Sequence, residues 1–132
     1  IQLSYIGYRA FAGTCIETLK FPSSGVHFEN GWCAFLQKCK NIEIIQNNFQ
    51  EILYYDGQFL LGKSLHYSNN FDVLLFANRE IENAKIPSFV KIISPFSFCY
   101  CTKLKSIEFE DDSQLKIIDK RAFLFSAIET IT

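Results

Sequence analysis

The residue types best suited to chemistry in this chain are its five cysteines, because a thiolate can attack an electrophile or bind a metal. They are Cys15, Cys33, Cys39, Cys99 and Cys101. Structural zinc sites use closely spaced ligand pairs, and the two histidines, His27 and His66, do not complete such a pattern. Cys39 and Cys101 each stand three residues before an apolar residue that begins a predicted strand. We therefore interpret these two as packing residues and expect no metal site.

Other catalytic arrangements are also poorly supported by the sequence. The six glycines are dispersed and form no phosphate-binding loop. A cysteine nucleophile would need a histidine held beside it, which only folding could bring about for His66. Glu110, Asp111 and Asp112 form an acidic cluster without further oxygen ligands at defined spacing, which is typical of a solvated turn. We therefore expect no enzymatic activity and no cofactor.

The net charge also restricts the classes of partner. At pH 7 the formal charge is −1, and lysines alternate with acidic residues instead of forming a basic stripe. Nucleic-acid binding is therefore not expected. No apolar run reaches the roughly 20 residues that a membrane span requires. The chain contains no methionine, so we expect these 132 residues to be a segment of a longer or processed protein.

The elements that position these residues are repeated along the chain. The apolar pattern of residues 3–11 recurs in residues 115–123, and that of residues 16–19 recurs in residues 128–131. Repetition at this period is the signature of a solenoid, in which each coil buries its apolar side against its neighbours. We therefore predict a single solenoid over residues 1–132.

One repeat, residues 86–109, shows the expected course of a coil. Leu104, Ile107 and Phe109 alternate with polar residues, which indicates a short strand. Upstream, Ser94 and Pro95 are a typical helix cap and first helical residue, so a short helical turn is predicted there. The predicted fold is an α/β solenoid of about five coils, with a parallel β-sheet on one face and short helical turns on the other.

Alignment of the coils assigns strand residues to an inward or an outward side. The first strand residues are taken as Ile16, Ile42, Ile81, Leu104 and Ile128. The inward residues that follow are Leu19, Ile45, Ala84, Ile107 and Ile131. The outward residues, which are the candidate partner-binding face, are Thr18, Lys20, Ile44, Gln46, Asn83, Lys85, Ser106, Glu108 and Thr130.

The interval between the second and third coils is longer than the others and indicates an insert at residues 48–80. Within it, Asp56-Gly57 separates two apolar stretches, which is a strong signal for a β-hairpin turn. We predict a β-hairpin or small meander. Its large apolar residues favour a segment that covers the core over a projecting recognition surface.

The residue pattern of the repeats resembles that of a known family. The pattern Ile-Pro-Ser-x-Val, then Ala-Phe or Ser-Phe, then Cys, then Leu-x-x-Ile-x-Phe is similar to the BspA-like, or Treponema pallidum-type, leucine-rich repeats. Within that family the chain looks most like the expanded set of mucosal protozoan parasites. The chain departs from the pattern around residues 22–39, where we expect the second coil to bulge, and at Thr14 and Ser126, whose hydroxyls should bond to nearby backbone.

The resemblance implies a non-enzymatic, adhesin-like module that binds a protein partner, on a cell-surface or extracellular protein. The mixed charge of the outward face suits a protein partner. A second interpretation remains open, namely a cytoplasmic or cytoskeletal scaffold component held among neighbouring subunits of a larger assembly. The unpaired cysteines favour this second interpretation because they suit a reducing compartment.

Overall fold

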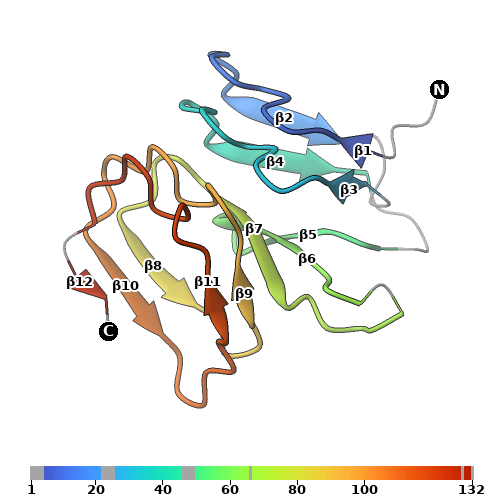
Figure 1. Ribbon diagram of the computed structural model, residues 1–132, viewed down its shortest axis with the longest axis vertical. Helices are drawn as coiled ribbons and strands as arrows, with labels where there is room; N and C mark the ends of the chain where they lie inside the picture. Colours follow the sequence, from blue (N-terminus) through green and yellow to red (C-terminus); the bar gives the residue numbers. More distant parts are fainter. Residues whose placement is uncertain (1–4, 22–25, 46–49, 66, 129, 132) are drawn as a thin grey trace.

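A computed structural model of the chain describes residues 5–21, 26–45, 50–65, 67–128 and 130–131. Five strands form one row of a solenoid, which we call the front row; it is the more distant row in Figure 1. β2 (Thr18–Phe21) pairs in parallel with β4 (Asn41–Ile44). β10 (Ser106–Phe109) pairs in parallel with both β8 (Asn83–Ile86) and β12 (Thr130–Ile131). Within β2 and β8, buried residues alternate with more exposed ones, because successive side chains point to opposite faces.

A second row of strands, which we call the return row, faces the front row and lies nearer to the viewer in Figure 1. β1 (Tyr5–Ile6) pairs in parallel with β3 (His27–Phe28). β9 (Ile92–Ile93) pairs in parallel with β7 (Val73–Ala77) and β11 (Ile117–Ile118). We number the coils by their return and front strands: β1–β2 is coil one, β3–β4 coil two, β7–β8 coil three, β9–β10 coil four and β11–β12 coil five. The predicted solenoid is therefore confirmed, with two parallel rows of strands.

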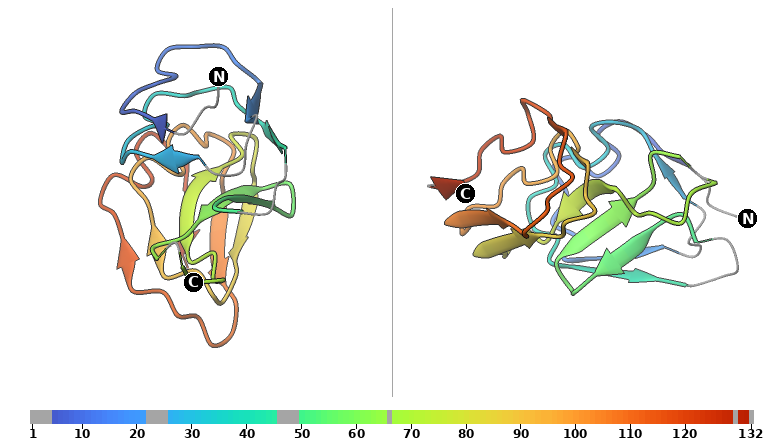
Figure 2. Two further views of the ribbon diagram at one scale, coloured as in Figure 1. Left: turned by 90° about the vertical axis from the view of Figure 1, so that its right-hand side faces the viewer. Right: turned by 90° about the horizontal axis from the view of Figure 1, so that it is seen from below.

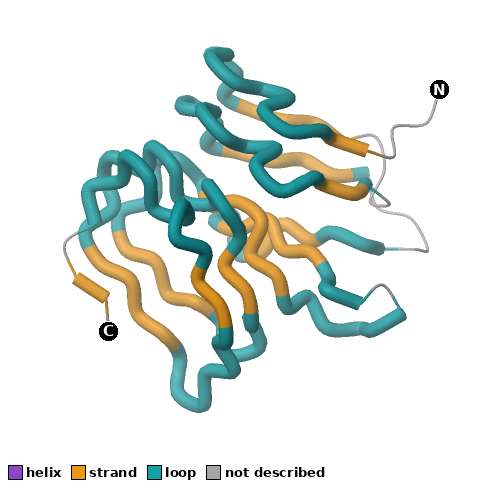
Figure 3. Tube along the Cα trace, in the orientation of Figure 1, coloured by secondary structure: helices purple, strands orange, loops and turns teal. Residues whose placement is uncertain are grey.

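The predicted short helical turns are wrong, because the described residues contain no helix (Figure 3). After Pro95 the chain instead forms consecutive turns in which Ser97 N–H, Cys99 N–H and Cys101 N–H each bond to the carbonyl three residues back. The amides between them point outward from the turn and donate to coil five. They are Phe96 N–H to Arg121 O at 3.2 Å, Phe98 N–H to Ala122 O at 2.8 Å and Tyr100 N–H to Leu124 O at 3.2 Å. A helix would use all of these donors internally, so the turns stack coils where a helix could not.

The turns depend on left-handed backbone at two positions four residues apart. The first position is held by Arg9, Gly31 and Phe96, with φ of 57°, 83° and 62°. The second is held by Gly13, Phe35, Tyr100 and Phe125, with φ of 72°, 61°, 59° and 60°. Such residues interrupt a right-handed helix, because each reverses the local twist of the chain. At Gly31 a Cβ would lie 2.6 Å from the Tyr8 ring, so that position also requires glycine for space.

The register of coil two differs from the predicted one by three residues. Leu19 pairs with Ile42, and Glu17 O accepts from Lys40 N–H as Glu82 O accepts from Lys105 N–H. Cys39 therefore occupies, in coil two, the position that Leu104 occupies in coil four. The sequence alignment had assigned Ile42 to that position. Ile45, predicted to be inward, is 65% exposed. The other predicted inward residues that can be described, Leu19, Ala84 and Ile107, are buried, and the side chain of Ile131 lies outside the described residues.

The hairpin predicted from Asp56-Gly57 is present. β5 (Leu53–Tyr55) and β6 (Phe59–Gly62) pair antiparallel, and Asp56 and Gly57 have φ of 54° and 65°. β6 then pairs antiparallel with β7 and joins the return row, which gives the strand order β11-β9-β7-β6-β5. All four residues of β6 are buried, so the insert covers the core and does not project from it.

The insert also divides the core into two clusters, with its strands lying between the coils drawn in blue and those drawn in orange (Figures 1 and 2). From β6, Leu60 packs into the cluster that holds the core of coils one and two together with Phe76, Phe96 and Cys99. Its neighbours Phe59 and Leu61 pack into the cluster of coils three to five. β6 therefore separates the two clusters and packs apolar side chains on both of its faces, which explains its continuous apolar sequence.

Arg79 fills the interior between coils two and four, where coil three has only a short turn. The residue is 3% exposed, and its guanidinium donates to Leu36 O at 2.7 Å and Ser97 O at 2.8 Å. It also donates to Cys33 O at 3.2 Å and lies 4.4 Å from the centre of the Phe76 ring. Between coils four and five, backbone amides of the turns make the connecting hydrogen bonds. Between coils two and four, the N–H donors of the single Arg79 side chain make them instead.

Candidate interaction surface

The candidate interaction surface is the outward side of the front strands, which we call the strand face. In coils one and two, Thr18 lies opposite Asn41, and Lys20 lies opposite Glu43. Lys20 Nζ is 4.0 Å from Glu43 Oε2, and both side chains are more than half exposed, at 76% and 56%. An ion pair this exposed adds little stability, so these charges are available to a partner.

In coils three and four, the strand face repeats this arrangement of a polar pair followed by opposite charges. Asn83 lies opposite Ser106, whose hydroxyl donates to Asn83 Oδ1 at 2.8 Å. Lys85 lies opposite Glu108, and both are exposed. Both strand pairs therefore present neutral hydrogen-bonding groups at one end and a lysine beside a glutamate at the other.

Not all the predicted face residues belong to the strand face. The assignment of Ile44 to the outward side is wrong, because Ile44 pairs with the buried Phe21 and packs against the core of coils one and two. Gln46 lies outside the described residues, and Thr130 is placed in β12 opposite Ser106 with its side chain outside the description. The shifted register adds Asn41 and Glu43, which the prediction missed. They could have been identified from the sequence, because the pattern Lys-x-Ile-x-Ile of residues 40–44 matches the pattern Lys-x-Ile-x-Phe of residues 105–109.

Two open hollows lie at the far ends of these strand pairs. The first, of about 500 Å³, is lined by Lys20, Phe21, Glu43, Ile44 and Ile45. The second, of about 440 Å³, is lined by Lys85, Glu108, Phe109, Glu110 and Asp111. Each hollow combines a lysine, a glutamate and the side of an apolar residue, which is a mixed chemistry that suits protein side chains.

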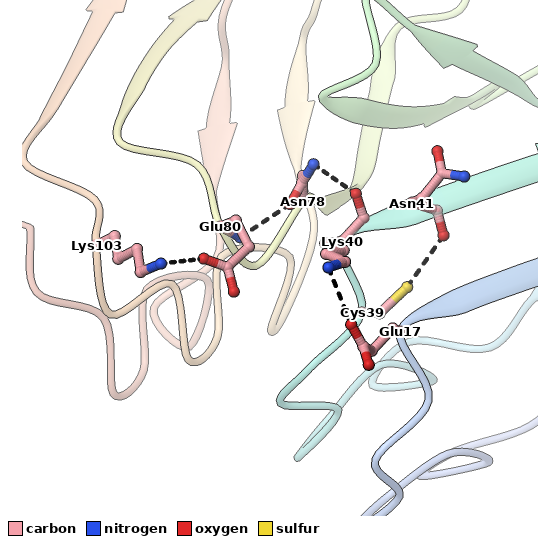
Figure 4. Close-up of polar contacts among 7 residues, drawn as sticks. All are labelled: Glu17, Cys39, Lys40, Asn41, Asn78, Glu80 and Lys103. Atoms are coloured by element: carbon pink, nitrogen blue, oxygen red, sulfur yellow. Dashed lines mark hydrogen bonds and ion pairs between the residues drawn. The ribbon is translucent and has the colours of Figure 1, made fainter.

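A polar ladder crosses the coils at the beginning of the front strands (Figure 4). Lys40 Nζ lies 3.0 Å from Glu17 Oε1, and Asn78 Nδ2 donates to Lys40 O at 2.6 Å. Asn78 Oδ1 accepts from Glu80 N–H at 2.9 Å, and Glu80 forms an ion pair with Lys103. The ladder therefore links coils one to four at the point where the strands of coils two and three do not pair.

The charges of this ladder shift the pKa values of its members in the expected directions. The hydrogen bond to Glu17 raises the pKa of Lys40, and the hydrogen bond to Glu80 raises the pKa of Lys103. The Lys103 ammonium in turn lowers the pKa of Glu80. All three side chains keep their charge at neutral pH, so the ladder is not poised for acid–base catalysis.

Four of the five cysteines lie where packing, not chemistry, is favoured. Cys33, Cys39, Cys99 and Cys101 are buried free thiols, and Cys15 is an exposed one. Burial raises the pKa of Cys33 and of Cys101 to about 11, and it also raises the pKa of Cys39 and Cys99. A thiol with a raised pKa is a poor nucleophile because so little of it is thiolate at neutral pH. The predicted equivalence of Cys39 and Cys101 is wrong, since Cys39 takes the place of Leu104 and Cys101 that of Leu36.

The remaining candidate groups do not converge on a site. Within the described ranges, no three His, Cys, Asp or Glu side chains are grouped so as to hold a metal ion. His27 lies on β3, and His66 falls outside the description. Glu110 accepts from Ser88 N–H at 2.9 Å, while Asp111 and Asp112 are exposed. Nor is there, in the part of the chain that is described, an apolar helix of membrane-spanning length.

The two hydroxyls that depart from the repeat pattern behave differently. Thr14 Oγ1 donates to Phe11 O at 2.8 Å, as predicted. Ser126 Oγ is buried without a hydrogen-bond partner among the described atoms, so the prediction for this residue is wrong.

Comparison with known proteins places this geometry in a family. The sequence matches the BspA type leucine rich repeat region in six copies, over residues 1–60 and 63–132. No curated protein matches the chain in sequence. The fold is similar to that of a leucine rich cell surface protein from Faecalibacterium prausnitzii A2-165, with a TM-score of 0.79 and 24% identity. The similarity covers 97% of this chain and 32% of that protein, so this chain spans about a third of its length. The match of the family pattern along nearly every coil, together with the stacked coils themselves, shows that this chain belongs to the BspA-type leucine-rich repeat family.

Proposed function

We propose that this chain is a non-enzymatic, adhesin-like module that binds a protein partner through the strand face. The observation that carries the proposal is the repeated exposure, on coils one to four, of a neutral polar pair beside a lysine–glutamate pair. The contact residues are Thr18, Lys20, Asn41, Glu43, Asn83, Lys85, Ser106 and Glu108. Thr130 continues the line on β12.

The physical support for this proposal is the rigidity and the chemistry of the strand face. Backbone pairing fixes the spacing of the exposed side chains, so a partner meets a preformed surface and little conformational entropy is lost on binding. Its charges alternate in sign, which favours a partner with complementary charges over a polyanion. Repeat proteins commonly bind along such extended surfaces.

The proposal can be tested by adhesion of beads coated with the chain to mucosal epithelial cells. Replacement of Lys20 and Lys85 by serine should reduce the number of adhering beads about tenfold, because two interface charges are lost. The matched control replaces Lys91 and Lys116, two lysines of the return side, by serine and should adhere like the original chain. Equal adhesion of all three proteins would overturn the assignment of the strand face.

We also propose a cell-surface location, supported by the likeness to a cell-surface protein of the same fold class. The alternative, a cytoplasmic or cytoskeletal scaffold, is favoured by one observation, namely that all five cysteines are free. Antibody labelling of the source cells distinguishes the two. Labelling of intact cells supports the surface location, whereas labelling only after permeabilisation supports the scaffold.

A further inference from the structure

The turns between the return and front strands carry bulky side chains at positions where the backbone favours glycine. Phe35, Tyr100 and Phe125 hold the second left-handed position of their coils, which Gly13 holds in coil one. A side chain in this conformation costs about 1–2 kcal/mol relative to glycine, because its Cβ approaches the following carbonyl. Three of the four coils that have this position therefore accept strain in order to display an aromatic ring.

The three rings form one cluster, which we call the turn-face cluster. Tyr100 and Phe125 are stacked, with centroids 5.0 Å apart and planes inclined at 27°. Phe35 lies 6.3 Å from Tyr100 and 6.4 Å from Phe125, and so spans the place where coil three lacks a turn. Phe125 is 55% exposed, and the other two rings are partly exposed. The cluster is therefore an apolar surface that lies on the turns and not on the strand face.

Folding alone does not account for the exposed Phe125 ring. Each aromatic contact contributes about 0.5–1.5 kcal/mol beyond the area it buries, which is close to the strain of one left-handed residue. For Phe125, which is 55% exposed, the two effects nearly cancel, whereas Phe35 and Tyr100 also gain stability by packing against the core. Bulky residues in strained backbone are a reason to look for binding at that place.

The charge beside the cluster indicates the chemistry of what binds. The Arg9 guanidinium lies 4.6 Å from the centre of the Phe35 ring and 5.6 Å from that of Tyr8. No carboxylate of the described residues is within ion-pair distance of it, whereas Arg121 near Phe96 is already paired with Asp119 at 3.4 Å. A guanidinium resting on rings is weakly hydrated and keeps its in-plane N–H donors for a bidentate carboxylate.

We propose that Arg9 and the turn-face cluster form a second binding site, which takes an extended peptide of a partner protein carrying a carboxylate next to an aromatic or aliphatic side chain. Arg9 binds the carboxylate, and the apolar side chain packs on Phe35, Tyr100 and Phe125. This site is separate from the strand face and does not depend on it.

The test is selection of random decapeptides, displayed on phage, against the immobilised chain. The expected result is enrichment of sequences in which Asp or Glu stands beside an apolar residue. Each enriched peptide is then synthesised with a fluorescent label, and its dissociation constant is measured by fluorescence anisotropy. Arg9→Gln should weaken binding about tenfold, as loss of one charged hydrogen-bonded contact does.

The variant with Tyr100→Gly and Phe125→Gly removes the rings and relieves the strain at once, so it should fold and yet bind about tenfold or more weakly. Circular dichroism checks its fold. The control with Lys91→Ser and Lys116→Ser should bind like the original chain. Neutral or basic selected peptides, no enrichment at all, or binding unaffected by Arg9→Gln would each overturn the proposal. If the selected peptides lost affinity for the Lys20→Ser, Lys85→Ser variant but not for the Arg9 or ring variants, the peptides would bind the strand face. That result would overturn this proposal and leave the strand-face proposal intact.

Discussion

At the scale of single residues, the buried thiols show how far burial changes ordinary chemistry. Cys33 is fully buried, and its Sγ lies 3.3 Å from Phe96 O. Desolvation is the main cause of its raised pKa, and the nearby Arg79 guanidinium only partly opposes it. The same side chain that suggested nucleophilic or metal chemistry in the sequence is therefore a neutral packing group at physiological pH.

This shift predicts a loss of stability in alkali. The pKa of Cys33 rises from its ordinary value of 9.0 to about 11 on folding. Between these values the folded chain holds a proton that the unfolded chain has lost, so raising the pH through this window favours unfolding. The slope for one such group is at most about 1.4 kcal/mol per pH unit. Urea unfolding of the original chain and of Cys33→Ala from pH 8 to 11 measures it, and identical slopes would contradict the prediction.

At the scale of elements, the inward and outward sides of a coil should differ in their tolerance of change. Phe98 is fully buried and stacks on Phe123 with centroids 4.9 Å apart. Phe98→Ala should lower the free energy of unfolding by about 3–5 kcal/mol, as large-to-small core changes do. Ser106→Ala removes only an exposed hydrogen bond to Asn83 and should change it by less than about 0.5 kcal/mol. Denaturant unfolding compares them, and comparable losses would refute the assignment of sides.

The hairpin of the insert gives a second prediction at this scale. Gly57 has φ of 65° and would leave a Cβ in open space, so Gly57→Ala adds backbone strain without a clash. We expect a loss of about 1 kcal/mol. Gly7 is the matched control, because its added Cβ would meet only ordinary contacts at 3.8 and 3.9 Å and its φ lies outside the left-handed region. Thermal unfolding of both alanine variants should show a lower midpoint for Gly57→Ala only.

The sequence predicts the elements well where side-chain alternation decides and poorly where backbone geometry decides. The strands of coils three to five follow from the alternation of residues such as Ile107, and the hairpin follows from Asp56-Gly57. The register of coil two was missed because a cysteine, Cys39, stands where the other coils have leucine or isoleucine. The turns were missed because nothing in the sequence marks Phe35 or Tyr100 as left-handed, a conformation that sequence rules assign to Gly and Asn. Ile44 entered the candidate face through that same shift of register.

At the scale of the whole molecule, two stacks of coils are joined by an insert and by one buried cation. The described strands of coils two and three do not pair with each other, so β6 and the buried Arg79 hold the junction together, and the exposed polar ladder crosses it. These contacts come from segments far apart in the sequence. This is why the repeat pattern, which describes one coil and its neighbour, did not foresee them.

Arg79 should therefore contribute more to the free energy of unfolding than an exposed cation does. Arg79→Ala removes the side-chain donor to the buried Leu36 carbonyl, leaves Ser97 O with only its bond from Ala77 N–H, and opens a cavity, so we expect a loss of about 3–5 kcal/mol. Arg79→Lys should recover only part of it, because one ammonium cannot reach carbonyls on both sides. Lys103→Ala, which breaks an exposed ion pair, is the control and should cost less than about 1 kcal/mol. Urea unfolding decides, and an Arg79→Ala variant as stable as the control would show that the junction does not need the guanidinium.

The recurring left-handed residue of the turns has an evolutionary consequence. Its backbone is the same whether the coil carries glycine or an aromatic ring, as Gly13 and Tyr100 show. Gene duplication and point mutation can therefore swap rings in and out at this site, coil by coil, while the architecture stays unchanged. A lineage can diversify what such a protein recognises without having to reinvent how it folds.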